Sequence, residues 1–166
     1  MFVVVGVLLG TLLGFRLLGA LGVERFGTWR VSAAHALAAM LVLTASAHFV
    51  PGGVTVMPNH EVMVRMVPPF VPFPAFMVYA TGVLELLGAA GLVLTATRRT
   101  AGRCLAVLFV LLLPANVHAS ISGVETVTPL WLRVPEQVLY IAIALWAARE
   151  VSRPRSVPIS PAPVRG

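Results

Sequence analysis

Glu85 is the residue of this sequence whose type and position most clearly suggest chemistry. It lies near the middle of Phe76–Leu94, a run of nineteen residues in which it is the only charge. At about 1.5 Å of rise per residue, such a helix crosses a bilayer core of roughly 30 Å. A carboxylate near the midplane costs at least roughly 2.5 kcal/mol, so it must face protein and find a partner, or be protonated. Glu85 therefore marks either a proton, ligand or partner site, or a hydrogen bond that locks two helices together.

Small residues accompany Glu85 along one face of this helix. Gly82, Gly88 and Ala89 lie one turn away on either side of it. In membrane helices, small side chains let a neighbouring backbone approach closely. We therefore expect the face that carries Glu85 to be buried against other helices.

The composition indicates an integral membrane protein. Of the 166 residues, 58% are hydrophobic and 11% are charged, and the mean hydropathy is +0.94; a soluble domain carries about 25% charged residues. The net charge of +6 does not indicate a nucleic-acid partner, because the arginines are spread over predicted loops. A single cysteine, Cys104, excludes an internal disulfide and a cysteine-based zinc site, and the four histidines lack metal-ligand spacing. We therefore expect no metal.

Five apolar runs predict five transmembrane helices in a single domain, residues 1–150. Their predicted bounds are about 1–22, 31–50, 75–96, 103–121 and 133–149. The first run has no basic segment before it and no evident cleavage site, which favours a retained helix over a signal peptide. Residues 151–166 are rich in proline and arginine, and we expect a disordered tail there.

The connection over residues 51–74 has its own features. Pro58–Met66 predicts a short interfacial helix with an apolar side, since proline is favourable at a helix start. Four prolines between residues 68 and 74 cannot continue a helix, so they predict an extended strap. The strap would either simply connect two helices at the headgroup level or cover a lateral entrance to the bundle.

The distribution of arginine predicts the orientation. If the N-terminus is outside, nine arginines fall on the inner side, and only Arg65 and Arg133 fall on the outer side. Basic residues favour the cytoplasmic side of a membrane. We therefore expect a multi-pass protein with its N-terminus outside and its C-terminus inside.

In this orientation, polar side chains gather in the outer half of the bundle. They form a candidate polar pocket of five residues: Glu85, His48, Asn116, His118 and Gln137. The inner half is nearly free of polar groups, which argues against a through channel and favours a pocket that opens outward. Glu85 with a histidine or an asparagine could hold or pass a proton there. Alternatively, these groups satisfy one another within a polar core.

Several segments between about residues 45 and 147 share an order and spacing with a known family. They are Ala47-His48-Phe49, MVPPFVPFP, VYATGVLELLGAAGLVL, LPANVHA and LRVPEQVLYIAIALW. In these segments the chain resembles the DoxX and DoxX-like family of small bacterial membrane proteins. The resemblance implies a four-helix bundle in the bacterial plasma membrane, to which the first helix is an addition. Positions characteristic of that family are occupied by Glu85, Pro114, Asn116, Arg133, Pro135 and Gln137.

The resemblance also implies a function. It suggests an accessory subunit of a quinone-linked redox system, with a quinone or a lipid as ligand and a protein of the redox complex as partner. No haem, flavin or iron–sulfur pattern is visible, so we expect no catalytic activity of the chain on its own. A non-catalytic scaffold or assembly factor is the alternative. A lipid carrier or isomerase that uses Glu85 and a histidine as acid and base ranks third.

Overall fold

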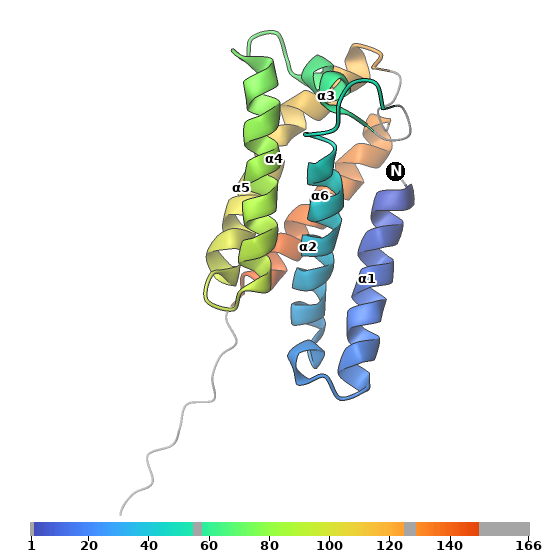
Figure 1. Cartoon of the computed structure of the whole chain (residues 1–166), viewed down its shortest axis with the longest axis vertical. Coiled ribbons are helices and arrows are strands. Elements are labelled where there is room, and N and C mark those ends of the chain that lie inside the picture. Colours follow the sequence, from blue (N-terminus) through green and yellow to red (C-terminus); the bar gives the residue numbers. More distant parts are fainter. Residues whose placement is uncertain (1, 55–57, 125–128, 150–166) are drawn as a thin grey trace, which may run out of the picture.

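The computed structural model describes residues 2–54, 58–124 and 129–149, and these residues form helices and connecting turns without strands (Figure 1). The helices are α1 (Phe2–Ala20), η1 (Glu24–Phe26, a 3-10 turn), α2 (Trp29–Ser46), α3 (His60–Met66), α4 (Pro74–Val93), α5 (Arg98–Ile121) and α6 (Leu130–Ala147). Among them, α1, α2, α4, α5 and α6 are long and apolar enough to cross a membrane. The prediction of an all-helical protein with five helices of spanning length is confirmed. The predicted tail, residues 151–166, lies outside the described residues.

Helix α2 is the centre of the bundle. It packs against α1, α4 and α6, while α5 packs against α4 and α6. Its buried face is rich in alanine, which allows neighbouring helices to come close. The largest fully buried apolar side chains of the core come from α1, α2, α4 and α5, and they are Leu8, Leu37, Met40, Leu41, Leu92 and Leu105.

Helix α1 is the outermost of the long helices and packs against α2 and η1. Its single arginine, Arg16, ties it to the turn that leads into α2. The Nη1 atom of Arg16 donates a hydrogen bond of 2.7 Å to the Phe26 carbonyl, and its guanidinium lies 4.9 Å from the centre of the Trp29 ring. The attachment of α1 to the bundle therefore includes a polar contact and a cation–π contact that the sequence pattern did not reveal.

Helix α3 lies across the end of the bundle at which α2 ends and α4 begins (Figure 1). It begins two residues later than expected, because Asn59 caps it: the Asn59 side-chain oxygen accepts a 3.0 Å hydrogen bond from the Val62 amide. The connection from α3 to α4, residues 67–73, is the predicted strap, and we use this name below. Pro74 is not part of the strap but begins α4, since proline fits a first turn whose amide has no partner within the helix.

Two helix starts differ from the predicted bounds by three residues or more. Helix α5 begins at Arg98 rather than at about residue 103, so the arginines expected in a tight turn lie in its first turns. Arginine is a good helix former, and the segment contains no proline to stop a helix. Helix α6 begins at Leu130, which places Pro135 inside the helix. A proline so close to a helix start removes only one backbone hydrogen bond of the early turns.

Candidate functional site

A cavity of about 420 Å³ lies among the long helices, beneath α3 and the strap. We call it the Glu85 cavity. Its volume is within the range of roughly 300–1,000 Å³ that is typical of small-molecule sites. Four of the five residues of the predicted pocket line it: Glu85, His48, Asn116 and Gln137. Most other lining residues are apolar, and α3 and the strap contribute Met63, Met66, Val67, Pro68, Phe70 and Val71.

His118 does not line the Glu85 cavity. Its Nδ1 atom lies 3.2 Å from the Met66 carbonyl, so it holds the end of α3 against α5. Its Nε2 atom lies 3.1 Å from the Ser122 hydroxyl. The His118 side chain faces a separate groove, which runs between α5 and residues 68–70. The structure therefore gives His118 a place in anchoring the roof of the cavity, not in its wall.

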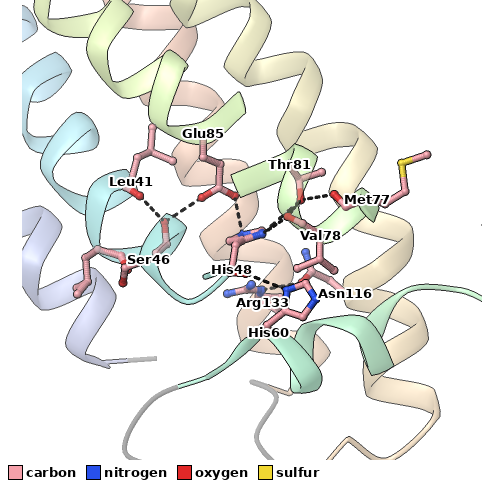
Figure 2. Close-up of polar contacts among 12 residues, drawn as sticks. Leu41, Ser46, His48, His60, Met77, Val78, Thr81, Glu85, Asn116 and Arg133 are labelled. Carbon is pink, nitrogen blue, oxygen red and sulfur yellow. Dashed lines mark hydrogen bonds and ion pairs between the residues drawn. The ribbon is translucent and has the colours of Figure 1, made fainter. Parts of the chain in front are cut away.

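Glu85 is buried, with 6% of its surface exposed, and it contacts the end of α2 (Figure 2). Its Oε1 atom lies 3.7 Å from Nε2 of His48. Its Oε2 atom lies 3.2 Å from the hydroxyl of Thr44, which is also within reach of the Leu41 carbonyl. The carboxylate thus has two side-chain partners, and both come from the last turn of α2 and the residues just after it.

The tautomer of His48 follows from its other contact. Its Nδ1 atom lies 2.7 Å from the Val78 carbonyl, and a carbonyl oxygen can only accept a hydrogen bond. Nδ1 must therefore carry a hydrogen, which leaves Nε2 to face the Glu85 carboxyl group. An attractive contact between them needs one proton, carried either by Nε2 or by the carboxyl oxygen. With the proton on Nε2, the contact is an ion pair at the wall of the cavity.

The charge of Glu85 also acts on the acidity of His48, which lies just beyond the spanning part of α2. Burial by itself would lower the pKa of His48. The contact with the negative charge of Glu85 at 3.7 Å, together with the hydrogen bond to the Val78 carbonyl, outweighs burial and raises the pKa above its ordinary value. The protonated form of His48 is therefore favoured beside Glu85.

A glycine makes the approach of His48 to α4 possible. A Cβ atom added at Gly82 would lie 2.6 Å from the Cβ atom of His48 and 3.1 Å from the Phe49 ring. Gly88, one turn beyond Glu85, faces Leu105 of α5, where an added Cβ atom would lie 2.4 Å from a methyl group. The face of α4 that carries Glu85 is buried, as we expected from its small residues.

The remaining polar residues of the cavity make contacts of their own. Asn116 Oδ1 accepts a 3.1 Å hydrogen bond from Nε of Arg133, whose Nη1 atom lies 3.5 Å from a carboxylate oxygen of Glu136. Gln137 Nε2 donates a 2.6 Å hydrogen bond to the Phe109 carbonyl. Phe109 directly precedes Val110, whose carbonyl lacks its usual helix donor because Pro114 has no amide hydrogen. Both contacts connect α6 to α5.

Sequence reasoning missed several residues of the cavity. Thr44 and Thr81 lie in apolar helices, and each hydroxyl bonds a backbone carbonyl three residues earlier. Threonine is common in such positions, so its presence did not indicate a cavity. Tyr140 also lines the cavity and was not among the expected residues. Among the described residues, no three histidine, cysteine, aspartate or glutamate side chains lie close enough together to hold a metal ion.

Comparison with known proteins places the chain in a family. Residues 37–148, about two thirds of the chain, match the family described as Domain of unknown function (DUF8561), so the chain belongs to that family. The match begins within α2 and ends just after α6, and therefore leaves α1 outside it. No curated protein matches the chain. No solved structure matches it either.

Proposed function

We propose that this member of the DUF8561 family binds a lipophilic small molecule of the quinone class in the Glu85 cavity, as an accessory component of a membrane redox system. The observation that carries the proposal is the cavity itself. It is a largely apolar, partly open volume of about 420 Å³ with a polar wall formed by Glu85 and His48. Apolar walls with a few converging polar groups are the usual design of a small-molecule site. The resemblance to DoxX-like proteins supports the quinone class.

The two parts of the cavity suit the two parts of such a ligand. The apolar wall would surround a ring or a hydrocarbon chain, and methionines such as Met63 and Met66 can adapt to its shape. The Nε2–H group of protonated His48 would donate a hydrogen bond to a carbonyl oxygen of the ligand. The ligand would then be oriented with an oxygen toward α4 and the end of α2.

The lining residues also suggest how a lipophilic ligand enters. Leu84 of α4, Leu111 of α5 and Phe70 of the strap line the cavity, yet 50%, 69% and 78% of their surfaces are exposed. Lining residues that also reach the surface of the bundle favour an opening toward the lipid. A molecule dissolved in the bilayer would enter there without crossing water.

We propose further that the chain lies in a bacterial plasma membrane with its N-terminus outside. The α1–α2 and α4–α5 turns lie at one end of the bundle, and α3 lies at the other (Figure 1). The arginines near the two turns include Arg25, Arg30, Arg98, Arg99 and Arg103, whereas Arg65 lies on α3. This asymmetry favours the turns inside and α3 outside.

Cysteine labelling of intact cells tests this orientation. In a Cys104→Ser background, the exposed residues Arg65 and Glu24 are replaced singly by cysteine. A maleimide that cannot cross the membrane is expected to label the cysteine at position 65 and not the one at position 24. The reverse pattern would overturn the proposed orientation.

Ligand binding is tested by native mass spectrometry of the protein in mild detergent, with decylubiquinone as the probe. We expect the wild type to retain the quinone and Glu85→Gln to lose most of it. Glu24→Gln makes the same chemical change on the exposed η1 turn and should bind like the wild type. Equal retention of quinone by Glu85→Gln, or none by the wild type, would contradict the proposal.

The second candidate function is a scaffold without a ligand. It is favoured by the structural partners of three predicted site residues: Arg133 for Asn116, the Met66 carbonyl for His118 and the Phe109 carbonyl for Gln137. A scaffold predicts that Glu85→Gln weakens the folded bundle or its assembly with a partner protein while no small molecule is bound by either form. A lipid carrier or isomerase ranks third, and it would require turnover that depends on Glu85.

A further inference from the structure

Tyr140 of α6 has a hydroxyl group that nothing in the described part of the chain satisfies. The residue is buried, with 5% of its surface exposed, and its hydroxyl oxygen has no hydrogen-bond partner among the described residues. Buried tyrosine hydroxyls usually find a hydrogen-bond partner, since a buried polar group without a hydrogen bond costs about 1–3 kcal/mol. An unsatisfied group of this kind calls for a physical explanation.

The position of Tyr140 supplies that explanation. It lines the Glu85 cavity, and its ring packs 6.1 Å from the ring of Phe109 on α5. Phenylalanine would fill the same space without a buried hydroxyl. Two other side chains have unpartnered buried atoms among the described residues, Nε of Arg16 and Oε1 of Glu136, but neither residue lines the cavity. The Tyr140 hydroxyl is thus the unsatisfied side-chain group that belongs to the cavity.

We propose that the Tyr140 hydroxyl donates a hydrogen bond to an oxygen of the bound molecule and so forms a second polar contact, from α6, beside the one that Glu85 and His48 offer from α4 and α2. This inference rests on the proposed function of the cavity and narrows its ligand. The ligand carries acceptor oxygens on a compact ring, as a quinone does, because an aliphatic lipid chain has no acceptor to offer. A purely hydrocarbon molecule of equal size would fill the space and leave the hydroxyl unsatisfied.

The ligand class is tested with two small probes of nearly the same shape. Duroquinone and durene share a six-membered ring with four methyl groups, but only duroquinone has carbonyl oxygens. Its ring has no free position, so the exposed thiol of Cys104 has no open ring carbon to add to. Dissociation constants are measured by thermal shift at matched probe-to-detergent ratios for the wild type, Tyr140→Phe and Tyr79→Phe. Tyr79 is half-exposed and does not line the cavity, so Tyr79→Phe is the matched control.

The proposal predicts that Tyr140→Phe weakens duroquinone binding by about threefold to tenfold, the value of one neutral hydrogen bond. Durene binding should be unchanged by Tyr140→Phe, and Tyr79→Phe should change neither probe. Without a probe, the melting temperature of Tyr140→Phe should equal or exceed that of the wild type, because a buried unsatisfied group has been removed. A structural role of the hydroxyl would instead lower it.

The outcomes separate this inference from the function on which it rests. Equal binding of duroquinone by the wild type and Tyr140→Phe would overturn the role of Tyr140 and leave the binding cavity standing. A lower melting temperature of unliganded Tyr140→Phe would overturn it as well, since the hydroxyl would then have a partner in the protein. If the wild type binds neither duroquinone nor durene, both the inference and the proposed function are overturned.

Discussion

Nε2 of His48 lies 3.7 Å from Oε1 of Glu85, and this contact joins the end of α2 to the middle of α4. The other ring nitrogen, Nδ1, bonds the Val78 carbonyl, which is also on α4. His48 is therefore held at two points of α4 although it lies in the connection that follows α2. This arrangement explains how a carboxylate can lie deep among apolar helices, because the imidazole of His48 and the hydroxyl of Thr44 both face it.

Replacement of Glu85 separates its charge from its hydrogen bonds. Glu85→Leu leaves His48 and Thr44 without their buried partner, and we expect a loss of roughly 3 kcal/mol in the free energy of unfolding. Glu85→Gln offers an amide donor to Nε2 of neutral His48 and an acceptor to Thr44, so its loss should be closer to about 1 kcal/mol. Melting temperatures in detergent measure both, at about 2–4 °C per kcal/mol. Equal melting temperatures of the two variants and the wild type would show that the contact contributes nothing.

Stability should depend on pH through His48. Its pKa is raised in the folded protein, because Glu85 and the Val78 carbonyl outweigh the opposing effect of burial. The folded state therefore binds the proton more tightly than the unfolded chain does. This contribution is fully present below the ordinary pKa of 6.5 and is lost as the pH rises through the raised value.

The measurement is the melting temperature as a function of pH in one detergent. The wild type should become less stable as the pH rises above 6.5, and His48→Gln and Glu85→Gln should both flatten this slope. The other three histidines, His35, His60 and His118, are the same in the wild type and both variants, so a difference between the curves reports the contact between His48 and Glu85. An unchanged slope in His48→Gln would mean that another group causes the dependence.

Gly82→Ala should disturb the contact between α4 and the end of α2. The added methyl group would lie 2.6 Å from the Cβ atom of His48, which cannot retreat without moving the backbone. We expect a loss of about 1–3 kcal/mol, typical of overpacking. Gly10→Ala is the control, since an added Cβ atom at this position of α1 meets no atom within 4 Å. Its expected effect is a gain of up to about 1 kcal/mol from improved helix propensity.

Gln137→Leu tests the contact between α6 and the backbone of α5. It removes the donor that bonds the Phe109 carbonyl at 2.6 Å, and we expect a loss of roughly 1–3 kcal/mol. Val138→Leu places the same side chain on the neighbouring, exposed position and should leave the melting temperature nearly unchanged. A similar result for both variants would show that the Phe109 carbonyl needs no donor from α6.

The sequence could predict the depth of the polar residues but not the direction in which they point. Helices of similar length in a common orientation place residues at comparable heights, which brought Glu85, His48, Asn116 and Gln137 to one level. The prediction that His118 lines the pocket is wrong, because His118 follows Asn116 by two residues and the helix turns by about 200° between them. With Asn116 facing the cavity, His118 must face away, toward the strap and the Met66 carbonyl.

Partners were harder to predict than burial. Small residues beside Glu85 were sufficient to predict a buried face of α4, because only close packing explains them next to a charge. The choice of His48 over Asn116 as partner depends on how α2 ends, and the pairing of Asn116 with Arg133 depends on where α6 begins. Helix ends are set by local caps and by tertiary contacts together, so a single sequence rarely determines them to the residue.

The walls and the roof of the cavity come from different parts of the chain. Residues Met63 to Val71, in α3 and the strap, close the space from above, while Glu85, His48 and Tyr140 lie in or next to the long helices. Evolution can therefore alter the short roof segment without disturbing the helices that insert into the membrane. Among homologues that differ in α3 and the strap, the polar residues of the Glu85 cavity would stay constant while the shape and length of the bound ligand differ. Exchanging residues 60–73 between homologues would then transfer the preference for a particular hydrocarbon chain of the ligand. The hydrogen bonds to the oxygens of its ring would stay as they are.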